Sequence, residues 1–342
     1  MSDSTMPTAV FDQNLPPFDE PRAASPVKPK PQFTSTRPSA NDFLCKKLRK
    51  SPVFQQIQIA NSSRTSPKIL CFIMSHSKSL TKISAVQKTW GRKCDRLLIA
   101  SNETDPTIGA VKMISDASYL GLWTKLNETM TYIWNEFGAE QFDWVLKADD
   151  DTFVIMENLK EYLSLPRITT NQPAIHGRRF SSPKYKHLER DEYFTSPQNA
   201  DFGKRFYAKI NRDAPVIYNH GGSGYVMNMG YVKKFVEVMH GPDTVHGTPA
   251  EDMAHGVVMA YQDLWPTNTR DELGRERFHP KDPRTMFSMP EDKFRLFNDN
   301  HQPTGGLSLG VDCCSEKSIT FHHIKPKNMI ALERVFYTCR GL

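Results

Sequence analysis

The stretch Phe142–Asp151, with the sequence FDWVLKADDD, decides the fold prediction, because an apolar segment delivers three carboxylates to one point of the chain. If the strand stays extended into the triplet, Asp149 and Asp151 point to one side and can share a metal ion, while Asp150 points elsewhere. Carboxylate oxygens suit Mg²⁺ or Mn²⁺, and such a site can hold a nucleotide diphosphate. The alternative is an acidic loop or a helix N-terminus, where Asp is also favoured.

Short apolar runs alternate with amphipathic segments around this stretch. The clearest helix is Leu122–Phe137, which places apolar residues on one face. This order predicts an α/β fold with a mostly parallel central sheet, crossover helices and a single domain. Ligands bind beyond the carboxyl ends of such strands, which favours the metal interpretation. We expect strands at 68–74, 95–100, 111–114 and 142–148, and further helices at 79–88, 152–163, 231–239 and 251–260.

The composition fits a folded protein with a modest positive charge. Of the 342 residues, 38% are hydrophobic, and 44 basic against 38 acidic residues give a net charge of +6. The charges are mixed along the chain, without the concentrated basic stripe of a nucleic-acid-binding protein. A phosphate-bearing ligand is compatible with this balance.

The chain divides at about residue 67. Residues 1–66 are predicted to be a disordered or linker region, because prolines lie among polar residues without apolar periodicity, although 42–60 can form a short helix and an extended lead-in. Residues 67–342 form the predicted catalytic domain, in which 181–216 is a polar surface excursion. No run of about 18 apolar residues predicts a transmembrane helix, and the N-terminus lacks signal-peptide features.

Two further segments carry polar or glycine-rich patterns. The glycines of 221–224 let the backbone approach a ligand closely, but their spacing matches no dinucleotide or Walker loop. Glu251 and Asp252 open a helix, where acids commonly interact with the helix dipole. The six cysteines fit no zinc pattern, and their even number is compatible with disulfides.

Over residues 67–342 the chain resembles the animal core 1 β1,3-galactosyltransferases (glycoprotein-N-acetylgalactosamine 3-β-galactosyltransferases) of the Fringe-like group. The resemblance rests on blocks that run in family order: 68–74 (KILCFIM), 89–94 (TWGRKC), 143–154 (DWVLKADDDTFV), 177–180 (GRRF), 221–226 (GGSGYV), 251–252 (ED), 270–271 (RD), 278–280 (FHP) and 313–322 (CCSEKSITFH). It implies a GT-A-type glycosyltransferase fold. It also implies an inverting enzyme that moves galactose from UDP-galactose to the 3-hydroxyl of GalNAc on Ser or Thr of a glycoprotein.

The resemblance also assigns roles to individual residues. Asp149, Asp151 and His322 would hold Mn²⁺ against the UDP phosphates, with Asp150 facing protein or donor sugar. Asp252 is the expected general base, preferred to Glu251, which would orient or bind instead. The remaining candidates are Lys125 and Arg179 for the donor, and His279. A structural role is favoured over a catalytic one for both Arg179 and His279, and for Lys125 a solvated helix face is an equal alternative.

Several departures from the family pattern qualify this assignment. Two family cysteines flanking the Glu-Asp pair are absent, the second position being Val258, which leaves Cys71–Cys94 as the expected pair. Residues 181–216 are an insertion, and 294–309 replace an aromatic-rich stretch on the acceptor side. His323 stands where the family usually has tyrosine. The family implies a Golgi membrane anchor, which is not visible in this chain, and leaves a homodimer open.

Two alternatives remain open at this point. The chain can be a related Fringe-like transferase with another UDP-sugar or acceptor. It can also be a non-catalytic relative that serves as a binding or chaperone-like partner. Such a relative would be expected to lose the triplet or the base, whereas Asp149, Asp151, Asp252 and His322 are all present.

Overall fold

The computed structural model describes residues 45, 50–61, 66–184, 194, 196–246, 250–288 and 310–339. The chain separates into two units, 1–39 and 40–342, and all described residues belong to the second. The predicted disorder of residues 1–41 and the replaced stretch 294–309 both lie outside the described residues.

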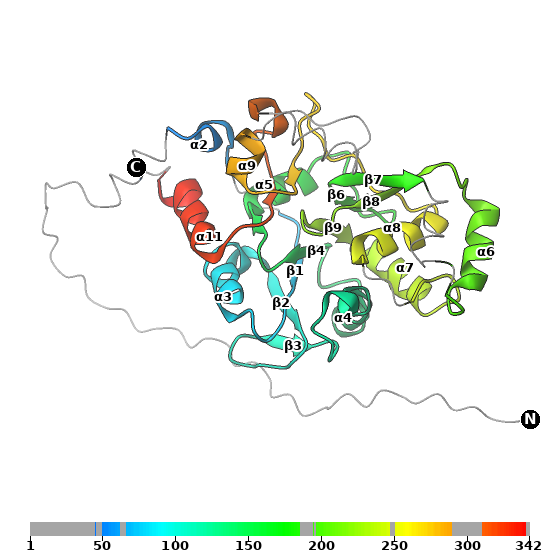
Figure 1. The fold of residues 1–342 in the computed structure, drawn as a ribbon. Coiled ribbons are helices and arrows are strands. Elements are labelled where there is room, and N and C mark those ends of the chain that lie inside the picture. Colours follow the sequence, from blue (N-terminus) through cyan, green and yellow to red (C-terminus); the bar gives the residue numbers. More distant parts are fainter. Residues whose placement is uncertain are drawn as a thin grey trace, which may run out of the picture. The chain divides into compact units, whose positions relative to one another are not determined.

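A six-stranded sheet forms the centre of this unit, in the order β3-β2-β1-β4-β9-β6 (Figure 1). The first four strands are parallel, and β9 and β6 add antiparallel pairs. Two helices, α3 (Leu80–Lys88) and α4 (Leu122–Phe137), are the crossovers between parallel strands. The predicted α/β fold with a mostly parallel sheet is therefore confirmed. The strands are β1 (Ile69–Met74), β2 (Arg96–Ser101), β3 (Ala110–Lys112), β4 (Trp144–Asp149), β6 (Ile175–Gly177) and β9 (Tyr225–Asn228).

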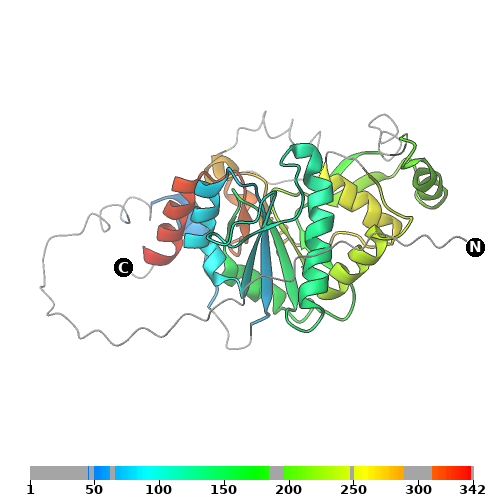
Figure 2. The ribbon, with the colours of Figure 1, turned by 90° about the horizontal axis from the view of Figure 1, so that it is seen from below.

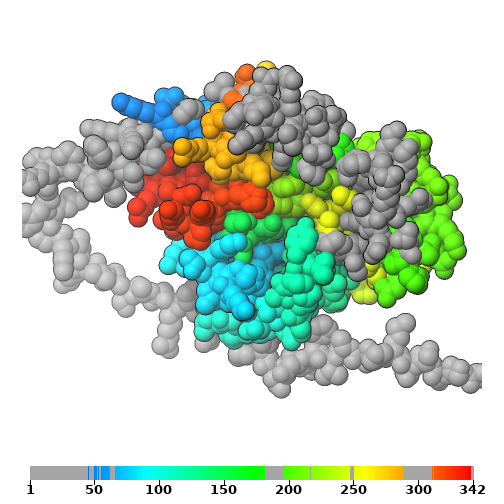
Figure 3. All heavy atoms as spheres, in the orientation of Figure 1, coloured from blue at the N-terminus to red at the C-terminus, as the bar shows by residue number. Residues whose placement is uncertain are grey.

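Helices cover both faces of the sheet. Figure 2 shows α3 and α11 (Pro326–Glu333) on one face and α4 on the other. Strand β1 is buried throughout and divides its side chains by the period of two: Leu70, Phe72 and Met74 join the core under α4, while Ile69, Cys71 and Ile73 join the second core. In Figure 3 the C-terminal residues lie directly against the segment that holds α3, as the packing of α11 on α3 requires.

The remaining elements complete these layers. On the α4 face lie α7 (Met229–Met239) and α8 (Glu251–Tyr261), and α5 (Met156–Leu163) contributes to the second core. Two small sheets are β10-β11-β5 (Phe278–His279, Thr320–Phe321, Phe153–Val154) and β7-β8 (Arg179–Lys184, Pro215–Asn219). The other helices are α2 (Pro52–Gln56), α6 (Ala200–Lys209), α9 (Pro283–Ser288), η1 (Trp90–Lys93), η2 (Tyr119–Gly121), η4 (Gly310–Cys313) and the π-helical η5 (Arg334–Thr338). None of the helices in the described ranges is long and apolar enough to cross a membrane.

Two segments differ from the sequence prediction. The helix expected over 152–163 begins only at Met156, because Phe153 and Val154 pair with β11 instead. The excursion 181–216 contains α6, whose Phe202 and Phe206 pack with Phe194 in an aromatic cluster. The described part of this excursion therefore has a buried side, which its polar composition did not predict.

Residues on the N-terminal side of the predicted boundary at 67 also pack on the domain. Ile57 is fully buried in the second core, and the Ala60 N–H donates to Asn158 Oδ1 at 2.8 Å. A disulfide joins Cys45 to Cys339. The short helix and extended lead-in expected within 42–60 are present as α2 and the residues after it.

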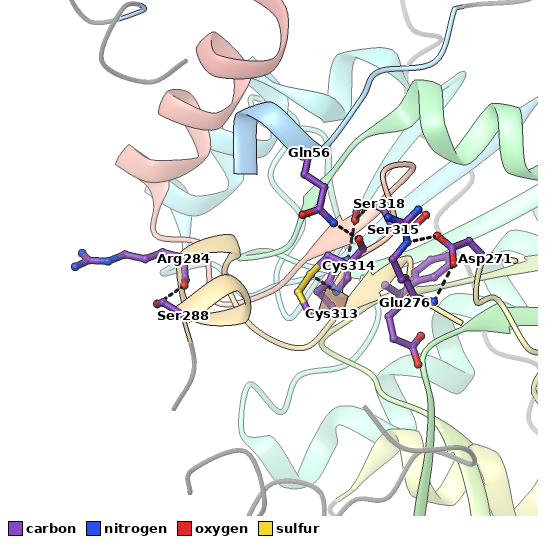
Figure 4. The surroundings of a disulfide bond; sticks show 12 residues. Gln56, Asp271, Glu276, Arg284, Ser288, Cys313, Cys314, Ser315 and Ser318 are labelled. Atoms are coloured by element: carbon purple, nitrogen blue, oxygen red, sulfur yellow. Dashed lines mark hydrogen bonds and ion pairs between the residues drawn. A yellow bond between two sulfur atoms is a disulfide. The ribbon is translucent and has the colours of Figure 1, made fainter. Parts of the chain in front are cut away.

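Two further disulfides lie within the domain. Cys71–Cys94 is the pair that the resemblance implied, and it ties β1 to the segment after η1. The adjacent Cys313 and Cys314, whose state the sequence left open, are bonded to each other (Figure 4). The Gln56 side chain donates to the Cys314 carbonyl at 2.5 Å, so this bridge lies under the N-terminal segment.

Candidate active site

The acid triplet lies at the carboxyl end of β4, and its members point in different directions. Asp150 is buried and accepts hydrogen bonds from Ser75 Oγ and Lys82 Nζ, both at 2.8 Å. Asp149 and Asp151 instead approach His322. The strand ends at Asp149, and the Thr152 N–H donates to the Asp149 carbonyl at 3.1 Å, so Asp150 and Asp151 lie in a turn rather than in an extended strand. It is this turn that directs Asp150 away from its two neighbours.

His322 comes from a distant part of the chain. Strand β11 pairs with β5 next to the triplet, with Phe321 opposite Phe153, so that the next residue lies beside the acids. Its Nε2 lies 3.1 Å from Asp151 Oδ1 and 3.7 Å from Asp149 Oδ2. Burial alone would raise the pKa of Asp151, but the hydrogen bond and charge of His322, helped by Lys82, lower this pKa to about 2. Asp151 is therefore an anion at neutral pH.

The glycine turn 221–224 packs against this imidazole. A Cβ on Gly222 would overlap the ring of His322, so only glycine fits there. Gly224 has a φ of 74°, in the left-handed region that glycine adopts freely. Thr152 Oγ1 donates to the Gly222 carbonyl at 2.8 Å, which fixes the turn to the residue after the triplet. The predicted close approach of this backbone is thus made to a side chain of the site.

The pair Glu251–Asp252 opens α8 on the other side of the same turn. Glu251 is 6% exposed and accepts a hydrogen bond from Tyr225 OH at 3.0 Å. Asp252 is half-buried and accepts from the backbone N–H groups of Gly221 and Met253, at 2.9 and 2.8 Å. Burial raises the pKa of both carboxyls, that of Glu251 to about 7 despite the attraction of Lys147. Both acids are consequently easier to protonate than ordinary carboxyls.

Lys147, on β4, connects the two groups of acids. Its Nζ lies 2.8 Å from Asp149 Oδ1, 3.1 Å from Glu251 Oε1 and 3.1 Å from the Gly221 carbonyl oxygen. Burial would lower the pKa of this ammonium, but the two carboxylates raise it above its ordinary value. The sequence prediction missed Lys147, although the period of two already places it on the side of Asp149.

The other predicted candidates lie at varying depth. Lys125 is buried and donates to the Ser75 carbonyl at 2.8 Å, so the alternative of a solvated helix face is wrong. Arg179 begins β7, where burial and the charge of Arg270 lower its pKa. His279 is fully buried, lies 3.0 Å from Ser318 Oγ through its Nε2, and stacks on Phe321, as expected of a structural residue.

Two residues that the sequence prediction left without a role also lie at the site. The first is His323, which has a ligand atom within 4.8 Å of ligand atoms of Asp151 and His322. The second is Tyr119, whose side chain is largely exposed. Partial burial of its hydroxyl, followed by the charges of Asp252 and Glu251, raises the pKa of this group. No motif marks Tyr119 in the sequence, because it approaches the site from the segment before α4.

The chain is similar to known glycosyltransferases. No protein-family model matches it. The glycoprotein-N-acetylgalactosamine 3-beta-galactosyltransferase 1 of Xenopus laevis is 30% identical over 275 residues, which are 80% of this chain and 67% of that protein. Among solved structures, the WbbM bifunctional glycosyltransferase is 14% identical, with a TM-score of 0.36 over 61% of this chain and 40% of the other. The galactosyltransferase LgtC, in complex with donor and acceptor sugar analogues, is 10% identical, with a TM-score of 0.35 over 80% and 99%.

The similarity to the Xenopus protein extends over most of the described domain. It agrees with the motif order read from the sequence, and the mostly parallel sheet agrees with the expected GT-A-type fold. On this similarity, the chain belongs to the family of glycoprotein-N-acetylgalactosamine 3-β-galactosyltransferases.

Proposed function

We propose that this chain is an inverting, metal-dependent glycosyltransferase that moves galactose from UDP-galactose to the 3-hydroxyl of GalNAc on Ser or Thr of glycoproteins. One observation carries the proposal. Asp149, Asp151 and His322 converge at the carboxyl end of β4, and Lys147 links this cluster to the pair Glu251–Asp252. A site for the donor and a carboxylate that can take the proton of the acceptor hydroxyl would then lie side by side.

The residues present fit a divalent metal. Two carboxylates and one imidazole form a mixed oxygen and nitrogen donor set that suits Mn²⁺. The Nε2 of His322 faces both acids, while its buried Nδ1 has no hydrogen-bond partner among the described residues. In this proposal Asp149, Asp151 and His322 are the ligands, and a bound Mn²⁺ supplies Lewis-acid stabilisation of the charge on the leaving UDP.

Asp252 is the proposed general base. Glu251 is held by Lys147 and Tyr225, and its other oxygen faces Gly221, where an added Cβ would come within 2.8 Å. Asp252 is less enclosed, and its raised pKa suits a group that must take a proton from the acceptor hydroxyl. Glu251 then has a positioning role, because it anchors the ammonium that also contacts Asp149.

The donor side has two further proposed contacts. Lys125 lies beside Ser75, which also holds Asp150, so the lysine supports the strand end where the diphosphate would bind. Arg179 pairs in the sheet with Asn219, which lies two residues before the glycine turn. Its cationic side chain would bind a phosphate or a sugar hydroxyl.

The disulfides support a secretory location. Three disulfides among the described residues are typical of a protein that folds in an oxidising compartment. A Golgi location, with a glycoprotein acceptor, is therefore part of the proposal.

The test is transfer from UDP-galactose to a peptide that carries GalNAc-α-Thr, with and without Mn²⁺. We expect product only with the metal, and a large loss in Asp151→Asn. Absence of turnover with several GalNAc acceptors would overturn the acceptor assignment. If Asp151→Asn kept both transfer and metal dependence, the ligand assignment would be wrong.

A further inference from the structure

His323 follows the proposed ligand His322, and its backbone is in an unusual conformation. Its φ is 59°, in the left-handed region that residues other than glycine rarely adopt. In an extended strand, adjacent side chains point to opposite faces, so two consecutive histidines would normally separate. Here the two imidazoles stack instead, with centroids 3.9 Å apart and planes at 25°. The left-handed turn thus brings both rings to one side.

Hydrogen bonds hold this turn from both ends. The His322 N–H donates to the His279 carbonyl at 3.1 Å, which keeps β11 in its sheet. On the other side, the Ile324 N–H donates to the Asp151 carbonyl at 2.8 Å. The backbone after His323 is therefore attached to the acid triplet itself. A strained conformation that its surroundings fix in this way is typical of a functional site.

The resulting cluster is slightly wider than an occupied metal centre. Ligand atoms of Asp151, His322 and His323 lie within 4.8 Å of one another. Protein ligands bind Zn²⁺ or Mg²⁺ at about 2.0–2.2 Å, so two ligands of one ion are at most about 4.4 Å apart. Because a metal ion lies near the plane of each imidazole that binds it, one of the two stacked rings must turn about its side-chain torsions before all three groups bind one ion.

We propose that His323 is a second imidazole ligand of the metal centre, which would then hold two histidines and acidic ligands. This inference rests on the proposed function, because it concerns the same metal. A second nitrogen ligand shifts the preference of a site from hard cations such as Mg²⁺ toward borderline ions such as Co²⁺ and Zn²⁺. The resemblance gives tyrosine at this position. With His323 there instead, this chain would bind Co²⁺ or Zn²⁺ more tightly than a relative that has the tyrosine.

The experiment measures metal binding directly, without UDP-sugar or acceptor. The variant His323→Asn removes the imidazole, and asparagine tolerates a left-handed backbone. We expect Co²⁺ affinity, followed by its visible absorption, to fall by about tenfold or more, the scale on which metal-site changes act. With Mn²⁺, electron spin echo spectra should show coupling to two imidazole nitrogens in the wild type and to one in the variant.

Controls separate this proposal from the proposed function. His240→Asn changes a histidine at the end of α7 and should leave both readouts unchanged. His323→Gly keeps the left-handed turn available and should reproduce the loss seen in His323→Asn, with thermal unfolding to check that both variants fold. If the wild type binds metal and both variants retain its affinity and nitrogen coupling, His323 is not a ligand. If the wild type binds no metal, the metal-dependent function itself fails.

Discussion

The ammonium of Lys147 and the carboxylate of Glu251 form an ion pair of 3.1 Å in which both side chains are almost completely buried. The same ammonium lies 2.8 Å from Asp149, so that one buried cation neutralises an acid on each side of the site. Buried charges are costly unless they are paired and hydrogen-bonded. This pairing offsets the repulsion between the two groups of acids, so they can lie close together.

Removing this cation should destabilise the fold. We expect Lys147→Met to lower the free energy of unfolding by about 3–5 kcal/mol, because it leaves two acids without their partner. Lys160→Met is the matched control, since Lys160 pairs with Asp95 at 3.1 Å on the surface and such pairs contribute at most about 1 kcal/mol. Urea unfolding followed by circular dichroism measures both. Equal midpoints for the two variants would contradict the structural role of Lys147.

The raised pKa of Glu251 predicts a dependence of stability on pH. Burial, opposed by Lys147, moves this pKa from its ordinary 4.5 to about 7. Between these values the folded chain retains a proton that the unfolded chain releases, so the contribution of this carboxyl is fully present below pH 4.5 and is lost as pH rises through 7. The unfolding free energy of the wild type, relative to that of Glu251→Gln, should therefore fall from pH 4.5 to pH 8.

Urea midpoints of both proteins, measured at several pH values across this window, provide the test. Glutamine does not titrate, so the difference between the two curves isolates the carboxyl. A difference that stays constant with pH would show that Glu251 titrates alike in the folded and unfolded chains. A difference that increases with pH would mean that its pKa is lowered rather than raised.

Local patterns in the sequence predicted the central fold well. The helix 122–137 was placed with its observed bounds, because one apolar stripe runs along it; in the structure it ends at the C-cap Gly138. Strands β1 and β4 were also anticipated, since short, predominantly apolar runs are typical of buried parallel strands. The acid triplet was located correctly at a strand end.

Long-range contacts explain what the sequence did not reveal. Lys147 reads as one charge in an apolar strand until β9 and α8 bring Tyr225 and Glu251 against it. The buried side of α6 depends on Phe194, which belongs to a polar stretch. In the sequence His323 is only a replacement of tyrosine. Its left-handed backbone depends on hydrogen bonds that its neighbours make to the carbonyls of Asp151 and His279, which no local pattern shows.

The aromatic cluster on α6 provides a test of the insertion. Phe206 is fully buried against Phe194 and Tyr261. We expect Phe206→Ala to reduce the unfolding free energy by about 3–5 kcal/mol, as large cavities in a core do. Leu273→Ala, at a side chain that is 74% exposed, should change it by no more than about 0.5 kcal/mol. If both variants unfold at the same denaturant concentration, α6 does not share the core of the domain.

The glycine turn predicts a specific loss of metal affinity. In Gly222→Ala the new methyl group would overlap the ring of His322, so the imidazole must move away from the acids. We expect Mn²⁺ affinity, measured by titration of the free-ion electron paramagnetic resonance signal, to fall by about tenfold or more. Gly230→Ala, on the exposed side of α7 where the nearest atom would be 3.5 Å away, should leave it unchanged. Unchanged affinity in Gly222→Ala would argue against His322 as a ligand.

The different environments of Glu251 and Asp252 predict distinct kinetic effects. If Asp252 takes the proton from the acceptor hydroxyl, Asp252→Asn should lower kcat by about 10²–10⁴-fold, the usual contribution of a general base. Glu251→Gln should have a smaller effect on kcat, because Glu251 acts through Lys147. In the wild type, activity should fall as pH decreases through the raised pKa of Asp252, since only the carboxylate accepts a proton. Metal titrations of both variants show whether Mn²⁺ still binds, which separates loss of the base from loss of the donor site. A larger kcat loss in Glu251→Gln than in Asp252→Asn, with metal binding intact in both, would reverse the two roles.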